Sequence, residues 1–325
     1  MKLPSGVNLS RLQSLLALLV MIVALSVMTD SFLTLDNGRN ILRQISVNLC
    51  LSTGLTLVIL TGGIDLSVGA VLALSGAVAA WLLKNGLVLP WLGLHADVTI
   101  AGAIWAAVIV GGLCGLANGL TITRLLLPPF VATLAMLSIA RGATLLSTGG
   151  FPITGLGSAF GFIGTGIWLG IPLPVWIAAV VVVLSVVLTQ RTPFGRHVFA
   201  VGGSERAARL AGLPVEHIKM LVYVTAGALS GLAGLMVVAR LDSAQPNAGV
   251  GYELDAIAAV VIGGTSLSGG RGSVAGTVLG CLIIGVLNNG LTLLNVSPFW
   301  QQVIKGLVII AAVAIDRAAA RRAAA

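Results

Sequence analysis

Long apolar runs, separated by short polar connectors, fill nearly the whole chain. Segments such as LVMIVALSVM and AAVVVVLSVVL are apolar throughout except for one serine each, and they lack the alternation of a membrane β-barrel strand. A helix needs about 20 mostly apolar residues to cross a bilayer, and it satisfies its backbone hydrogen bonds internally. The pattern predicts ten helices, at residues 12–29, 43–61, 65–84, 99–122, 128–147, 174–190, 219–240, 253–267, 273–293 and 299–316.

The composition agrees with this pattern and excludes an ordinary soluble domain. Hydrophobic residues make up 57% of the chain and charged residues 9%, against about 25% charged residues in soluble domains. We therefore expect an all-α polytopic membrane protein with about ten transmembrane helices, and a single transmembrane domain over residues 1–325. The net charge of +8 does not indicate nucleic-acid binding, because no soluble basic face is available to carry it.

The basic residues instead predict the sidedness of the chain. Lys2 and Arg11 precede the first apolar run. A cleaved signal peptide is the alternative here, but the run is longer than a usual signal core and many further runs follow. With the amino terminus inside, ten spans return the carboxy terminus to the cytoplasm, and most of the 18 Lys and Arg residues fall on that side. Residues 191–218 then form the longest cytoplasmic loop.

The predicted eighth span is the weakest of the ten. Its sequence, ELDAIAAVVIGGTSLSGG, is apolar for only about nine residues before glycines begin. Short segments interrupted by glycine occur in the broken helices of transport pathways. A bent helix near the membrane surface is the other interpretation, and the sequence leaves both open.

Two pairs of similar segments indicate an internal repeat. LANGLT (116–121) is similar to LNNGLT (287–292), and GGIDLSVGAV (62–71) is similar to GVGYELDAIA (249–258). The members of each pair fall on opposite sides of the membrane in the predicted topology, as an inverted repeat requires. A competing match, of the second segment to GGTSLSGG (263–270), does not fit that scheme.

Polar residues four apart form one stripe on the second predicted helix. Such a stripe either lines a translocation pathway or holds neighbouring helices together by hydrogen bonds. The expected spans show no central Asp, Glu or Lys of the kind that a proton or sodium relay uses, so we expect a neutral cargo without ion coupling. The stripe consists of Gln44, Asn48, Ser52 and Thr56.

We do not expect this chain to catalyse a reaction itself. It contains no Gly-Lys dipeptide and therefore no Walker A loop, so any ATP that drives it is hydrolysed by another chain. No nucleophile–base constellation of an enzyme is present in the spans. Cys50, Cys114 and Cys281 lie in apolar runs without the spacing of a metal site, and we expect neither a metal nor a cofactor.

One dense polar segment, SERAARLAGLPVEHIK (204–219), interrupts this apolar chain. It is similar to the EAA loop of ATP-binding-cassette (ABC) importer permeases, and its Glu, Ala, Ala and Gly residues fall at the positions of that pattern. A short helix with charges on one side can lie in the groove of a partner, and Gly212 followed by Pro214 would end it. A solvated loop would look similar. The predicted coupling residues are Glu205, Arg206, Ala207, Ala208, Arg209 and Gly212.

Three longer strings resemble the permease subunit of ribose-type monosaccharide ABC importers. They are VILTGGIDLSVGA (58–70), TPFGRHVFAVGGSERAARLAG (192–212) and ARLDSAQPNAGVGYELDAIAAVVIGGTSLSGGRGSVAGT (239–277), and the likeness extends over about residues 31–316. It implies a homodimer, or a heterodimer of two permeases, in the lipid of the bacterial inner membrane. It also implies a separate ATP-binding-cassette ATPase subunit, of one fused chain or two, and a periplasmic sugar-binding protein.

The resemblance assigns further roles. The loop around Glu205 to Gly212 would be the coupling helix that contacts the ATPase subunit. On the outer face, complementary charge would dock the binding protein through Arg39, Arg43, Arg240 and Asp242. The overall likeness favours ribose as cargo. Xylose, arabinose, galactose, a quorum-signal sugar or a branched-chain amino acid stay open, as does the less favoured ion-coupled carrier.

Overall fold

The computed structural model of the chain describes residues 9–89 and 94–324, with side chains from residue 14 to 87 and from 96 to 314. Lys2 lies outside the described residues, and Arg11 lies outside those with described side chains. Within these limits, seven helices are long and apolar enough to cross a membrane. They are α2 (Leu35–Leu60), α3 (Val68–Asn85), α4 (Ile100–Thr123), α5 (Pro129–Thr148), α7 (Leu173–Arg191), α10 (Val215–Leu241) and α12 (Val274–Leu293).

The remaining elements are shorter in their apolar part or short altogether. Helices α1 (Leu9–Met28) and α13 (Pro298–Ala324) contain the apolar stretches Ser14–Met28 and Pro298–Ala314 within the part of the chain whose side chains are described. The short helices are α6 (Ser158–Thr165), α8 (Pro193–Gly203), α9 (Glu205–Leu210) and α11 (Tyr252–Ile262). Three antiparallel strand pairs complete the fold: β1 (Leu87–Leu89) with β2 (Leu94–Ala96), β3 (Ile153–Thr154) with β6 (Ser243–Ala244), and β4 (Ile167–Trp168) with β5 (Ile171–Pro172).

The all-α membrane fold is confirmed, but the count of ten spans is not. The predicted eighth span is α11, which has 11 residues and ends at Ile262, because Gly264 takes a φ of +85° and turns the chain. Eleven residues span about 16 Å, roughly half of a hydrocarbon core of about 30 Å. Helix α2 begins eight residues earlier than predicted, because the Thr34 side chain accepts the Asn37 amide and caps it.

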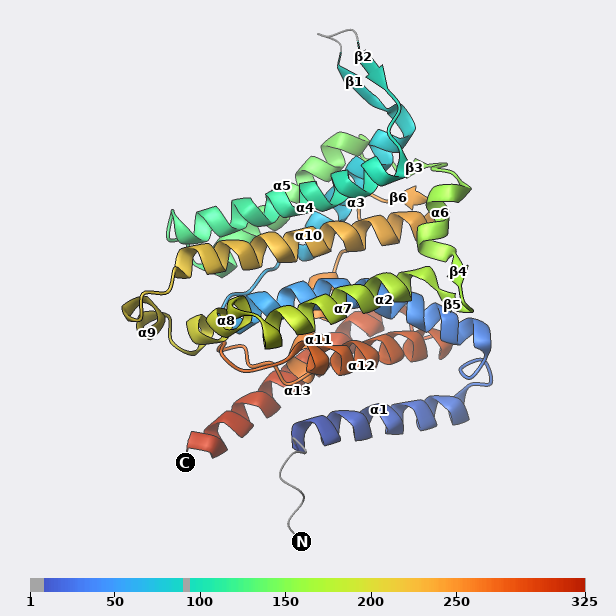
Figure 1. Ribbon diagram of the computed structural model, residues 1–325. Coiled ribbons are helices and arrows are strands. Elements are labelled where there is room, and N and C mark those ends of the chain that lie inside the picture. Colours follow the sequence, from blue (N-terminus) through green and yellow to red (C-terminus); the bar gives the residue numbers. More distant parts are fainter. Residues whose placement is uncertain (1–8, 90–93, 325) are drawn as a thin grey trace.

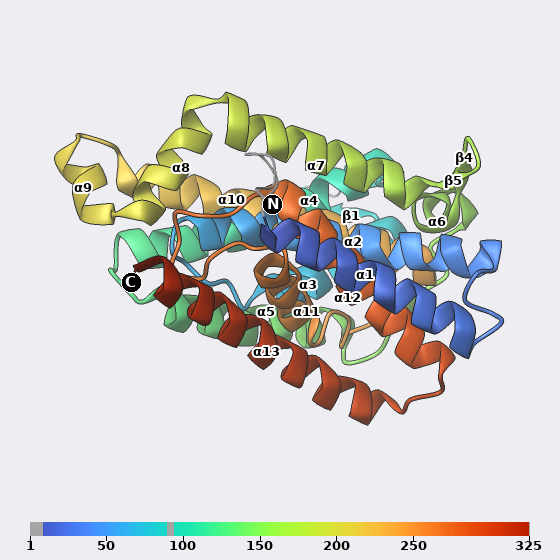
Figure 2. The same ribbon diagram turned by 90° about the horizontal axis from the view of Figure 1, so that it is seen from below.

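Helices α2, α4, α7, α10 and α12 lie side by side along roughly one direction, whereas α13 crosses them obliquely, as Figures 1 and 2 show. Helices α8 and α9 lie at one end of this bundle, and α6 with the β4–β5 hairpin lies at the other. Helix α1 runs toward the α6 end, and α13 returns to finish on the α9 side. We call these two ends the α9 end and the α6 end.

Glycines allow the central helices to touch backbone to backbone. On α4, Ala107, Gly111 and Gly115 recur every four residues and face α10. A Cβ built on Gly111 would lie 2.2 Å from the carbonyl oxygen of Gly227, and one on Gly115 would lie 2.1 Å from that of Tyr223. Small residues at this spacing are what close packing of membrane helices requires, and they bring the backbones of α4 and α10 into contact along several turns.

Helix α3 starts halfway along α10 and not at an end of the bundle. Leu72 and Gly76 lie against Gly234, and Gly76 also lies against Val238, so the two helices run in the same direction. Because α10 ends at Leu241, the first turn of α3 lies near its middle. Residues 61–67, which precede α3, are therefore non-helical backbone inside the bundle.

A second non-helical segment enters from the α6 end. After α10, residues 242–251 turn back until a Cβ on Gly69 would lie 2.2 Å from the Gly249 carbonyl oxygen. Arg141 of α5 donates from Nη1 to the carbonyls of Pro246 (2.7 Å) and Ala248 (2.9 Å). Non-helical backbone at membrane depth is stable where protein surrounds it. Helices α3 and α11 thus both begin inside the bundle, close to each other.

The paired segments found in the sequence contact each other within each half. Asn118 of LANGLT donates to the Ser67 hydroxyl (3.0 Å), which donates to Asp65 (2.6 Å). Asn288 of LNNGLT donates to Oδ2 of Asp255 (3.1 Å). These parallel contacts favour the inverted repeat, which stays a prediction.

Candidate functional site

The polar segment forms a separate small helix at the α9 end. Ser204 has an extended backbone, and its side chain accepts the Ala207 amide, so α9 begins at Glu205. The amide of Gly212 donates to the Arg209 carbonyl and that of Leu213 donates to the Ala208 carbonyl. Gly212 has a φ of +78°, which suits glycine at a helix end. The predicted short helix, ended by Gly212, is confirmed.

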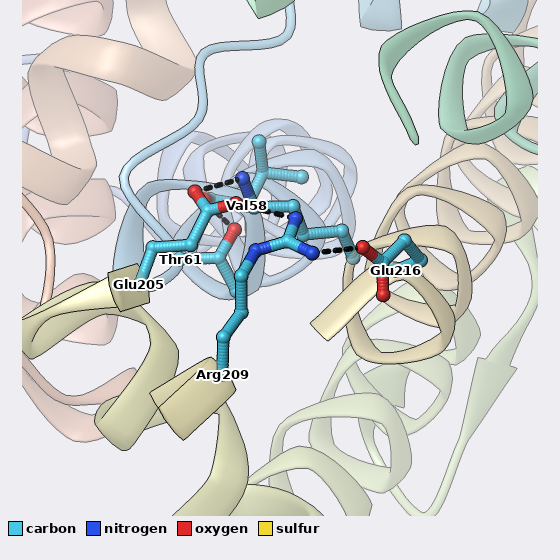
Figure 3. A network of polar contacts seen from close by, with 6 residues as sticks. Val58, Thr61, Glu205, Arg209 and Glu216 are labelled. Carbon is cyan, nitrogen blue, oxygen red and sulfur yellow. Dashed lines mark hydrogen bonds and ion pairs between the residues drawn. The ribbon is translucent and has the colours of Figure 1, made fainter. Parts of the chain in front are cut away.

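An ion-pair network ties α9 to the first turns of α10. Glu205 accepts from Arg209 (3.0 Å) and from Lys219 (2.6 Å), and Arg209 also pairs with Glu216. Figure 3 shows this network beside Thr61, at the end of α2. Burial raises the pKa of the Glu205 carboxyl, but the hydrogen bonds and charges of Lys219 and Arg209 outweigh burial and bring the pKa below its ordinary value.

The opposite face of α9 is free for contact. Arg206 and Ala207 are exposed, and Leu210 has 83% of its surface exposed, whereas Ala208 is buried. The structure thus divides the predicted coupling residues into those that hold α9 in place and those that face outward. Sequence reasoning missed Leu210, although a lone large apolar residue amid charges was a visible signal.

A polar pocket lies nearer to the α6 end, between α2, α10, α11 and α12. Its polar lining consists of Gln44, Asn48, Arg240, Tyr252, Asp255 and Asn288. Two members of the predicted polar stripe therefore line it. The other two, Ser52 and Thr56, are fully buried, and the Thr56 hydroxyl lies 2.7 Å from that of Thr277 on α12. The stripe faces the pocket at one end and holds helices together at the other.

The expectation that the spans contain no central acid or lysine was wrong. Asp255 is only 8% exposed, and Lys305 of α13 donates to its Oδ2 at 2.9 Å. Sequence reasoning placed Asp255 at the membrane surface, because a helix start normally lies there. Since α11 begins inside the bundle, its first turn carries the carboxylate to membrane depth.

The predicted docking residues are engaged within the chain at the α6 end. Arg43 donates to the Thr165 carbonyl (2.9 Å) and Arg240 to Oδ1 of Asn40 (2.7 Å). Asp242 accepts from the Leu156 amide (2.9 Å), and Arg39 lies 3.8 Å from Asp36. These bonds hold α2, α6 and α10 together, and the docking role of the four residues stays a prediction.

Within the described residues, no group of three or more His, Cys, Asp or Glu residues could hold a metal ion. The three cysteines are free, and Cys50 and Cys281 are buried among apolar side chains. The candidate functional features of the described chain are therefore the outward face of α9 and the transmembrane pocket.

Comparison with known proteins gives similarity along nearly the whole chain. A family model described as "Branched-chain amino acid transport system / permease component" matches residues 38–313. The ribose import permease protein RbsC of Bacillus subtilis (strain 168) is 50% identical over 311 residues, 95% of this chain and 93% of that protein. RbsC of Escherichia coli (strain K12) is 47% identical over 308 residues, 94% of this chain and 92% of its own.

A third relative carries a different sugar in its name. The D-allose transport system permease protein AlsC of Escherichia coli (strain K12) is 40% identical over 302 residues, 92% of this chain and 90% of that protein. No solved structure matches the chain.

Proposed function

The chain belongs to the family of branched-chain amino acid transport system permease components, and from this premise we propose that it is the membrane-spanning permease of a ribose importer driven by a separate ATPase. The observation that carries the proposal is the identity of 47–50% to ribose import permeases over more than nine tenths of the chain. The predicted resemblance to ribose-type sugar permeases is confirmed at the same time. The alternative cargo that the family description suggests, a branched-chain amino acid, is less favoured because these relatives are sugar permeases by name.

The partners follow from the importer class. A permease without a Walker A loop needs an ATP-binding-cassette subunit on its cytoplasmic side and a periplasmic binding protein that delivers the sugar. We assign the α9 end to the cytoplasm, because Arg191, Arg196, Arg206 and Arg209 gather there and positive residues favour the inside. Both termini are then cytoplasmic, and two copies of the chain, or this chain and a related one, enclose one pathway.

Helix α10 is suited to transmit motion from the ATPase to the pocket. The ion pairs of Glu205 with Lys219 and of Arg209 with Glu216 join α9 to the first turns of α10. Arg240, near the last residue of α10, lines the pocket. A helix of 27 residues is about 40 Å long, and tight packing against α4 makes it move as a rigid rod. Displacement of α9 on closure of the ATPase subunits would therefore shift one wall of the pocket.

Transport in a defined system tests the cargo and the energy source. The permease, the ATPase subunit and the binding protein are expressed in cells that lack their own ribose permease, and uptake of labelled ribose, xylose, arabinose, allose and leucine is measured. Ribose uptake should persist when an uncoupler is added at constant ATP, and it should stop when the ATPase carries an inactive Walker lysine. Uptake that collapses with the uncoupler, or that prefers leucine, would contradict the proposal.

Crosslinking tests the coupling surface. A cysteine at Leu210, in a chain whose half-buried Cys114 is replaced by serine, leaves only the buried Cys50 and Cys281 in the background. It should crosslink to the ATPase subunit, whereas a cysteine at the exposed Leu169, at the α6 end, should not. Two differently tagged copies of the permease that co-purify would support the homodimer.

A further inference from the structure

The transmembrane pocket gathers polar groups, and some of their atoms have no partner in the described part of the chain. Six polar residues line it in a chain of which only 9% is charged. We propose that it is a binding site for one neutral monosaccharide, held by hydrogen bonds to its hydroxyl groups. This inference rests on the proposed function and adds to it a site at which the permease itself recognises its cargo.

Two acceptor atoms on one wall lack a partner. Asn288 is 7% exposed, and its Oδ1 is buried without a hydrogen bond among the described residues. Its Nδ2 donates to Oδ2 of Asp255, which also accepts from Lys305, whereas Oδ1 of Asp255 accepts nothing from the part of the chain that is described. A buried carbonyl left unpaired costs about 1–3 kcal/mol. Together, Asn288 Oδ1 and the Asp255 carboxylate offer two neighbouring acceptors, which suit the hydroxyls on two adjacent carbons of a sugar.

Lys305 positions Asp255 in this wall but does not line the pocket itself. It lies outside the pocket lining and reaches Asp255 from α13 at 2.9 Å. Removing one member of a buried ion pair is costly, because the other charge is left without a partner. Here the hydrogen bond from Lys305 fixes the direction of the Asp255 carboxylate. Lys305 is thus a positioning residue. Because its charge already balances Asp255, the pair offers no unpaired carboxylate for the ammonium group of an amino acid.

The facing wall supplies donors. Oδ1 of Asn48 accepts from Ser52 at 3.2 Å, which leaves the Asn48 amide hydrogens to donate into the pocket. The Gln44 side chain makes no hydrogen bond with the described residues, and Arg240 uses one amino group on Asn40. Tyr252 adds a ring, and pockets for small molecules combine such apolar surface with a few convergent polar groups. Donors on one side and acceptors on the other match hydroxyls, which do both.

Binding to the permease alone tests the site. The full-length permease in lipid nanodiscs, without ATPase or binding protein, is titrated with labelled ribose and with 2-deoxyribose. Wild type should bind ribose at least 10-fold more tightly than 2-deoxyribose, since one lost hydrogen bond of about 1.4 kcal/mol is tenfold in Kd. Asn288→Leu and Gln44→Leu should each weaken ribose binding about 10-fold, and Asn288→Leu should abolish the discrimination against 2-deoxyribose.

Matched variants separate recognition from folding. Asn289→Leu removes the neighbouring amide, which is 4% exposed and bonded to Asn37 outside the pocket, and it should leave ribose affinity unchanged. Lys305→Met should weaken binding, and Lys305→Arg should restore it. Binding of the ATPase subunit to each nanodisc serves as the folding control, and Gln44→Leu keeps the test decisive should Asn288→Leu fail to fold.

The outcomes distinguish this inference from the proposed function. A wild-type importer that takes up no ribose overturns the proposed function. A wild-type importer that takes up ribose, with a permease that binds none or with pocket variants that bind like wild type, overturns the site alone. Leucine bound in place of ribose overturns the assigned class of ligand.

Discussion

Leu210 on the outward face of α9 gives the sharpest prediction for coupling. It is 83% exposed, and burial of a whole leucine side chain against a partner stabilises by about 1.5–3 kcal/mol. Leu210→Ala keeps the Cβ and should therefore weaken association with the ATPase subunit by up to about 2 kcal/mol, roughly 30-fold in Kd. Leu210→Asp should weaken it further, because a carboxylate would be desolvated in the interface.

Fluorescence titration of the labelled ATPase subunit against permease nanodiscs measures this change, and ribose-stimulated ATP hydrolysis reports its consequence. Leu169→Ala is the control, since Leu169 is 73% exposed at the opposite end of the bundle. Thermal stability of the permease should be the same in both variants, because an exposed side chain contributes little to the fold. Equal ATPase affinity in wild type, Leu210→Ala and Leu210→Asp would refute the coupling role of this face.

Five further predictions concern α9 and the bundle. Glu205→Lys replaces the anion that pairs with Arg209 and Lys219, so ribose uptake should fall more than ATP hydrolysis, while the amount of permease in the membrane stays the same. Normal ribose uptake would contradict the coupling role of α9. The folded-state pKa of Glu205 is lowered, so the stability that its ionised carboxylate contributes is present above about pH 4.3 and is lost as the pH falls through the lowered pKa. Ribose uptake per ATP hydrolysed should therefore stay constant from about pH 6 to 8 when it is measured at stepped pH. Gly212→Asp, at a φ of +78°, should cost about 1–2 kcal/mol by thermal shift and uncouple transport; wild-type values for both would count against it. Gly227→Leu, whose Cβ would meet a carbonyl oxygen at 2.2 Å, should abolish folded yield by size-exclusion chromatography, whereas Gly142→Leu, with nothing within 4 Å, should not. Arg141→Leu frees two carbonyls of residues 242–251 and should slow uptake without changing ATPase binding; an unchanged rate would show that the anchor is dispensable.

Hydropathy predicted most of the helices because apolar runs and their polar ends are local properties. Helices α4, α5 and α12 begin and end within one residue of the predicted positions, 99–122, 128–147 and 273–293. The short α9 was also predicted, since its cap Ser204 and its terminating Gly212 lie within one short stretch of sequence. Helices α6 and α8 were missed, because helices of eight and eleven residues are too short to give a spanning signal.

The pocket depended on information that spacing does not contain. The interval of four places Gln44 and Thr56 on one stripe, but only tertiary packing decides that one lines a pocket and the other is buried against Thr277. The Asp255–Lys305 pair joins residues 50 positions apart. It could be predicted only by knowing that α11 begins inside the bundle.

The half-length helix α11 also constrains how the protein is made. Its first turn lies at membrane depth, where lipid could not satisfy the free amide groups of a helix start, so the segment needs surrounding protein at that end. Its amino-terminal side needs Gly69 and Arg141 from earlier in the chain, and its Asp255 needs Lys305 from the last helix. The first turn of α11 can therefore reach its final contacts only after the last helix of the chain has been made.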